Sequence, residues 1–210
     1  LRGLPIGVGE AWRDDRQRRW LVVLAVLALV PFLGLLAAAW TWTPLSHAYA
    51  WIVTPALVML TVGVTVASQR YAALRRRLFV GFMAGWLGAI ALDAIHWLHA
   101  LWSPASSVAI VWSGMYAGTH DPTWWLAGYF NHWFLTGALW GTVYGLLAGK
   151  ARWGYGLLYS ALFWLVGAHT ALYAPAGWVL LPRGSFSVLL GLFAAHVVYG
   201  TVLGLLNERW

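Results

Sequence analysis

The sequence predicts an all-α fold: a polytopic transmembrane bundle of six helices, with residues 1–210 forming one domain. Three observations predict it: six long apolar stretches, a scarcity of charge, and basic residues confined to alternate loops. Of the 210 residues, 61% are hydrophobic and 9% are charged, against roughly 25% charged in soluble domains. So few charges cannot cover the surface of a water-soluble protein of this size, which indicates that lipid is its solvent.

Six stretches are long enough to cross a bilayer, since about 20 apolar residues span it as a helix. Lipid offers no hydrogen-bond partner to backbone N–H and C=O groups, so each span has to be helical and an open sheet is excluded. A signal peptide over Arg2–Ala39 is disfavoured, because its apolar run is longer than a usual signal core. The predicted spans are Trp20–Trp40, Trp51–Ser68, Leu78–Trp102, Leu126–Gly149, Gly154–Tyr173 and Phe186–Leu206.

The arginines predict the orientation. The loops on one side are basic, whereas the opposite loops hold only Arg183. Basic loops stay in the cytoplasm, so both termini are predicted to be cytoplasmic, including a basic N-terminal segment over residues 1–19. The basic residues of that side are Arg13, Arg16, Arg18, Arg19, Arg70, Arg75, Arg76, Arg77, Lys150, Arg152 and Arg209.

This distribution accounts for the net charge of +7 without a nucleic-acid partner. The lipid bilayer is the predicted partner, and the basic side faces anionic head groups. The chain has no cysteine, which excludes disulfides, iron–sulfur clusters and thiolate metal sites.

Residues 103–125 form the one long loop, on the outer side. Its apolar part, Val108–Tyr116, is too short to cross the bilayer, which predicts a re-entrant or surface-lying segment over the outer mouth. Long ordered loops are more often functional than short ones.

Glycines recur along the predicted spans at helical spacing. Small residues let helices approach closely in lipid. The strings Gly141-Thr-Val-Tyr-Gly-Leu-Leu and Gly200-Thr-Val-Leu-Gly-Leu-Leu are nearly identical, which suggests that spans three–four and five–six are repeated hairpins. Several separate glycine seams also predict other membrane subunits or a homo-oligomer as partners. These seams contain Gly81, Gly85, Gly88, Gly137, Gly141, Gly145, Gly200 and Gly204.

The segments HWFLTGALWGTVYG from His132 to Gly145 and AHVVYGTVLGLL from Ala195 to Leu206 resemble helices of the small YagU-like bacterial inner-membrane proteins. The resemblance covers spans four to six. It implies a multi-pass bundle in the bacterial inner, or cytoplasmic, membrane, and it implies no chemistry.

All seven histidines fall on the outer side of this topology. A rise of 1.5 Å per residue places His99 about 5 Å below the outer surface and His96, His132 and His169 about 9 Å below it. By the same count Asp93 and His196 lie about 15 Å deep. Three imidazoles from three spans therefore share one layer, above a carboxylate and a fourth imidazole.

Asp93 is the only acidic residue inside a span, and intramembrane ionisable residues usually face the bundle interior. Asp93, His96 and His99 step by three, so they lie on one side of their helix. His132 and His169 are predicted to face away from the glycines of their own helices, which weakens a single convergent site. A second interpretation is that Asp93 pairs with His196 or with the outer loop.

Three functional classes follow. The first is a subunit of a larger membrane complex, such as an electron-transfer complex, that binds b-type haem or a transition metal ion. The others are a conduit for protons or small solutes and a structural subunit without chemistry. For the first class, the candidate cofactor ligands are His96, His99, His132, His169 and His196, and the candidate metal ligands are Asp93, His96 and His99. The tryptophans inside spans, which either pack or line a flat cofactor, are Trp97, Trp133, Trp140 and Trp164.

No soluble-type catalytic motif is present: the chain has no Gly-x-Ser-x-Gly elbow, no phosphate loop and no His-Glu-x-x-His. The sequence therefore predicts no catalytic residue and leaves open whether the protein is an enzyme.

Overall fold

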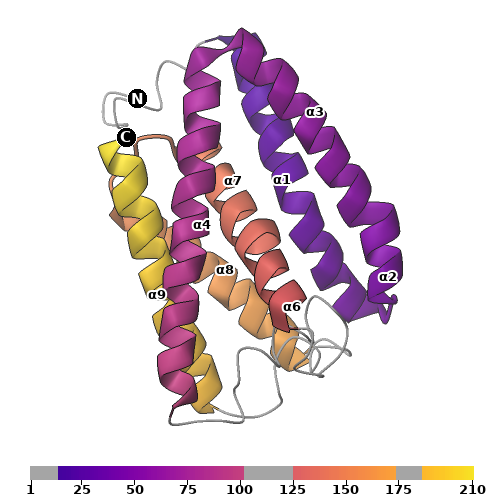
Figure 1. Ribbon diagram of the computed structural model, residues 1–210, viewed down its shortest axis with the longest axis vertical. Helices are drawn as coiled ribbons and strands as arrows, with labels where there is room; N and C mark the ends of the chain where they lie inside the picture. Colours follow the sequence, from indigo (N-terminus) through magenta and orange to yellow (C-terminus); the bar gives the residue numbers. More distant parts are fainter. Residues whose placement is uncertain (1–13, 102–124, 174–185) are drawn as a thin grey trace.

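A computed structural model describes residues 14–101, 125–173 and 186–210 of the chain. Within these ranges every regular element is a helix (Figure 1). Four of the helices are long and apolar enough to cross a membrane: Asp15–Thr41, Leu45–Arg70, Ala72–His99 and Leu189–Arg209. The predicted all-α membrane fold is confirmed at this level.

All six predicted spans fall on helical rods. α1 (Asp15–Thr41), α4 (Ala72–Ala100), α8 (Gly154–Tyr173) and α9 (Phe186–Arg209) are single helices. The second rod runs through α2 (Leu45–Ala48), the π-helix η1 (Tyr49–Val53) and α3 (Thr54–Arg70). The fourth rod joins α6 (Trp125–Asn131), the π-helix η4 (His132–Ala138) and α7 (Leu139–Ala148).

Capping residues and residues with a left-handed backbone mark where α1 begins and where α1 and α7 end. Asp14 caps α1, because its carboxylate accepts a hydrogen bond from the Arg16 backbone N–H at 2.9 Å. α1 stops at Trp42, whose φ of 56° is left-handed. α7 stops at Gly149, which has the same φ, and the Arg77 guanidinium donates to the Leu146 carbonyl at 3.0 Å beside it.

α4 lies at the centre of the bundle (Figure 1). It packs against α9 on one side, against η4 and α7 on another, and against α3 near its start. α1 packs between α3 and α7, and α8 packs mainly against α9. Residues of α4 therefore face three neighbouring rods.

The glycines of α4 and α7 bring the two backbones into direct contact. A Cβ added to Gly85 would lie 2.6 Å from the Gly141 Cα, and one on Gly145 would lie 2.8 Å from the Gly81 Cα. Neither distance is compatible with a side chain, so only glycine fits at this crossing.

α8 and α9 meet in the same way. A Cβ on Gly156 would lie 2.8 Å from the Gly204 Cα, and one on Gly200 would lie 2.8 Å from the Ser160 Cβ. Gly141 and Gly200, which begin the repeated heptapeptide, therefore occupy similar places in two glycine-packed hairpins. Both seams are used inside one chain, so they give no support to the predicted partner subunit or homo-oligomer.

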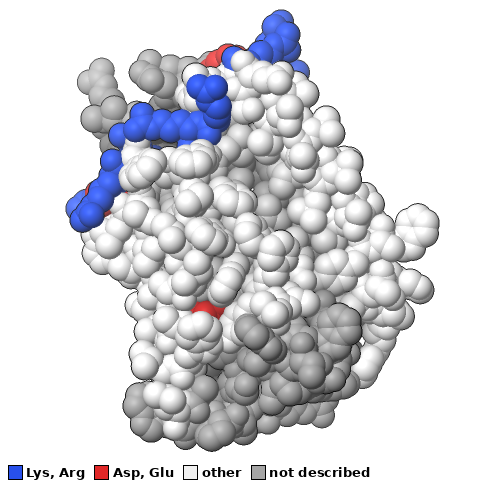
Figure 2. Space-filling view, in the orientation of Figure 1, with Lys and Arg blue, Asp and Glu red and all other residues white. Residues whose placement is uncertain are grey.

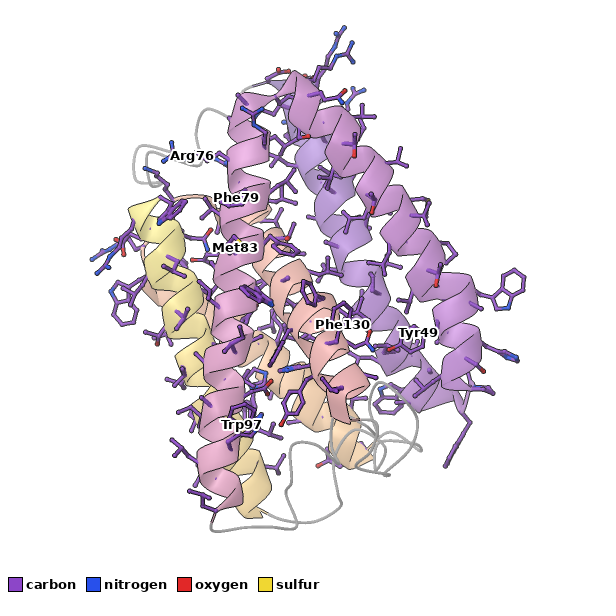
Figure 3. The ribbon with its side chains drawn as sticks, viewed as in Figure 1. Tyr49, Arg76, Phe79, Met83, Trp97 and Phe130 are labelled. Atoms are coloured by element: carbon purple, nitrogen blue, oxygen red, sulfur yellow. The ribbon has the colours of Figure 1, made fainter. Side chains whose placement is uncertain are left out.

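The basic residues gather at one end of the molecule (Figure 2). This end holds the start of α1, the junction of α3 with α4, and the end of α9, where Arg76 donates to the Trp210 carbonyl (Figure 3). Large apolar side chains are exposed along the outer sides of the rods, for example Val58, Val62 and Leu158. Most of the predicted outer loop, including Val108–Tyr116, and most of the basic N-terminal segment lie outside the described residues.

Candidate functional site

Asp93 is buried in the half of the bundle remote from the basic end. Its side chain lies on α4, between Arg76 near one end of that helix and Trp97 near the other (Figure 3). Asp93 is 1% exposed, and the two imidazoles beside it, His96 and His132, are 7% and 3% exposed. An unpaired carboxylate at such a place costs several kcal/mol or more, so its contacts decide what it does.

Three groups surround the Asp93 carboxylate. The Trp133 indole donates from Nε1 to Oδ2 at 2.6 Å, and His132 Nδ1 lies 3.2 Å from the same oxygen. His96 Nδ1 lies 3.6 Å from the other oxygen, Oδ1. The site therefore includes one acid, two imidazoles and one indole, taken from α4 and η4.

The π-helix η4 explains how His132 reaches Asp93. In an α-helix, His132 would point away from Gly137, five residues on, and the sequence predicts this opposite facing. A π-helix closes i→i+5 hydrogen bonds, so residues five apart lie on one side. Gly137 packs against Gly85 and Ala89 of α4, and His132 also faces α4. The predicted facing of His132 is therefore wrong.

An aromatic chain runs from Asp93 to the surface. The Tyr129 ring lies 5.7 Å from the Trp133 ring and 5.9 Å from that of Trp97. The Tyr129 hydroxyl accepts a hydrogen bond from Trp97 Nε1 at 2.6 Å, and Trp97 is 54% exposed. These rings enclose the carboxylate on the side of η4.

His99 and His196 lie on neighbouring faces of α4 and α9. The His99 ring is half-buried against Gly191, where an added Cβ would lie 3.1 Å from its Cγ. His196 donates from Nδ1 to the Leu192 carbonyl at 2.8 Å, so it is held by its own helix. Asp93 contacts His96, His132 and Trp133, so the interpretation that pairs it with His196 is not supported. The alternative pairing with the outer loop concerns residues that lie mostly outside the described ranges.

His169 lies apart from this group. It is exposed on α8, where its ring stacks on Trp40 at 6.1 Å and lies 4.8 Å from Tyr173. The prediction that it faces away from the glycines of its helix is confirmed. His47 is exposed in α2, and His120 lies outside the described residues.

The orientation of the ring nitrogens decides whether His96 and His132 can bind one haem or metal ion jointly. Both direct Nδ1 toward one carboxylate, so their Nε2 atoms lie on the sides of the rings away from it. Two axial haem ligands place Nε2 on opposite sides of the iron with their Nδ1 atoms far apart, and one carboxylate cannot contact both. Within the described ranges, no group of three or more His, Asp or Glu side chains is placed to hold a metal ion.

Trp133 and Tyr129 belong to the site, but the sequence does not mark them as such. Trp133 is predicted only to pack or to line a flat cofactor, because tryptophans are frequent in this chain. A useful signal would have been its place beside His132, opposite the one intramembrane acid.

Comparison with known protein families, with curated proteins and with solved structures gave no match. The resemblance to YagU-like proteins therefore stays a prediction.

Proposed function

We propose that the chain is a six-span protein of the bacterial inner membrane, with both termini in the cytoplasm and a proton-binding centre in its outer half. The gathering of basic residues at one end supports this orientation. The centre consists of Asp93, His96 and His132, with Trp133 as its fixed hydrogen-bond donor.

The observation that carries the proposal is a carboxylate 1% exposed and in contact with two imidazoles. With Asp93 ionised and both imidazoles neutral, the cluster carries one negative charge in an apolar interior, which is unfavourable. One added proton makes it neutral, either as a carboxylic acid or as an imidazolium beside a carboxylate. The Trp133 N–H carries no charge, so it orients the carboxylate without replacing that proton.

The proton exchanges with the outer face. Toward the basic end, several buried polar side chains donate to backbone carbonyls, among them Thr142 to Ala138 and Asn207 to Leu203, both at 2.8 Å. Ser160 donates to the His196 carbonyl at 2.6 Å. Side chains held in this way do not continue a proton path, so the centre binds and releases its proton on one side.

The test uses full-length protein in lipid nanodiscs, with histidine labelled by ¹⁵N. In a pH series from about 4 to 9, we expect the NMR shifts of His96 and His132 to change together in one step of proton uptake by the cluster. Asp93→Asn keeps the size of the side chain and removes that coupled step. His169→Gln, at an exposed histidine of the same half, leaves the step unchanged.

A different pair of results would contradict the proposal. In the first, His96 and His132 keep one protonation state over the whole pH range, and the carboxyl infrared band of Asp93 does not change. In the second, the two histidines titrate independently of each other, both in wild type and in Asp93→Asn. Both would reduce the cluster to a structural contact, as expected for a subunit without chemistry.

A metal ion or haem held by one of these imidazoles is the second candidate. It is favoured by the Nδ1 contacts with Asp93, since ligating histidines usually donate their other ring nitrogen to a carboxylate. Asp93 would then orient the ligand and would not bind the metal itself. An absorption spectrum with metal analysis tests this candidate: a Soret band, or a metal at one per chain that is lost in His96→Ala or His132→Ala, would establish it.

A further inference from the structure

We infer that His99 is the access residue through which a proton passes between the outer face and the centre at Asp93. The inference rests on the proposed function and assigns the route by which that site exchanges.

The first argument is the order of the three side chains along α4. Asp93, His96 and His99 follow each other at intervals of three residues, or about 4.5 Å of rise, on one side of the helix. Exposure increases along the series: Asp93 and His96 are buried, whereas His99 is half-buried in the last turn before α4 ends at Ala100. The series therefore connects the buried acid to the end of the bundle.

The second argument is that His99 follows His96 on the same side of α4 and packs against α9. Residues three apart on a helix are neighbours on its surface. Gly191 on α9 makes room for the His99 ring, because an added Cβ would lie 3.2 Å from both Nδ1 and Cδ2 of His99. An imidazole at this position has two ring nitrogens, so it can accept a proton at one and release a proton from the other.

An imidazole transfers a proton without any net change in its own charge. His99 accepts a proton from water at one ring nitrogen, and the proton on its other nitrogen leaves for His96. His96 then passes a proton to Asp93. The centre thus gains one proton for each proton that His99 takes from water. The other titratable groups that face this path are His132 on η4 and His196 on α9.

The test separates the rate of proton exchange from the extent of proton binding. The rate is followed after a pH jump in nanodiscs by the infrared bands of the Asp93 carboxyl group and of the imidazoles. In His99→Phe, which keeps a ring against Gly191, we expect exchange to slow on the order of ten- to a hundredfold while the binding step at equilibrium is unchanged. In His99→Ala, added free imidazole restores the rate.

His169→Phe is the matched control, because it replaces an exposed histidine of the same half that lies away from Asp93. Proton exchange at the wild-type rate in His99→Phe would overturn the role of His99. Equal slowing of exchange in His169→Phe would overturn it too, as would slowing in His99→Ala that free imidazole does not relieve. If wild-type protein shows no proton binding by the cluster of Asp93, His96 and His132, the proposed function itself fails, so the two failures are distinguishable.

Discussion

At the scale of single residues, the site is organised around Asp93. Its importance can be predicted from the sequence, because it is the one acid within the predicted spans, and His96 follows from the spacing of three. Trp133 cannot be predicted in this way, since the direction of its N–H depends on the contact between α4 and η4. The indole donates at 2.6 Å to an oxygen that also contacts His132, so Trp133 fixes the carboxylate that both imidazoles share.

Trp133→Phe should test this hydrogen bond. The substitution keeps an aromatic ring but leaves Asp93 Oδ2 without its N–H donor, which should destabilise the fold by about 1–3 kcal/mol. The measurement is thermal unfolding of the purified protein in mild detergent.

Trp86→Phe is the matched control for that measurement. Its Nε1 has no hydrogen-bond partner among the described residues, so the substitution removes ring area and no hydrogen bond. Equal losses of stability in the two variants would show that the Trp133–Asp93 bond contributes nothing of its own.

At the scale of elements, two features set the positions of the rods. The glycine seam between α4 and α7 can be predicted from the spacing of the glycines, and it lies where the repeated motif places it. The π-helix η4 cannot be predicted from the sequence, because hydropathy and glycine spacing are interpreted by assuming the periodicity of an α-helix. The wrong facing predicted for His132 has this single cause.

Gly141→Ala should disrupt the seam. An added Cβ would lie 2.6 Å from the Gly85 backbone N, and backbone atoms there have no space to move. We expect a loss of about 1–3 kcal/mol or more, measured by thermal unfolding. Gly167→Ala is the control, since nothing lies within 4 Å of its added Cβ, and similar melting of the two variants would contradict close backbone packing.

Insertion of one alanine after Thr136 should move His132 away from Asp93. The insertion places His132 six residues before Gly137, a separation that puts the two residues on different sides of the helix. We expect the helix content by circular dichroism to persist while the ¹⁵N shift of His132 no longer depends on Asp93→Asn. A shift that keeps this dependence would show that the wide turn does not position His132.

At the scale of the whole molecule, the pattern of apolar stretches along the sequence predicts the arrangement in helical rods. The sequence predicts six helical segments, and all six fall on rods, four of which are long and apolar enough to cross a membrane.

Reporter fusions test the orientation of the six spans. Fusions at Arg75 and Lys150 should report the cytoplasm, because both residues lie at the basic end, and a fusion near Asp121 should report the periplasm. A fusion at Arg75 that reports the periplasm would reverse the topology and place the Asp93 centre in the inner half.

The crossing of α4 and α7 has a mechanical consequence for the acid and its imidazole. With backbone against backbone at Gly85 and Gly141, the crossing is a stiff pivot, and relative motion of the two rods is mainly rotation about it. Asp93 lies eight residues beyond Gly85, a lever arm of about 12 Å, so a rotation of about 5° displaces it by about 1 Å. Because a hydrogen bond weakens over about that distance, we expect the contact between Asp93 and His132 to be sensitive to rotation at this crossing.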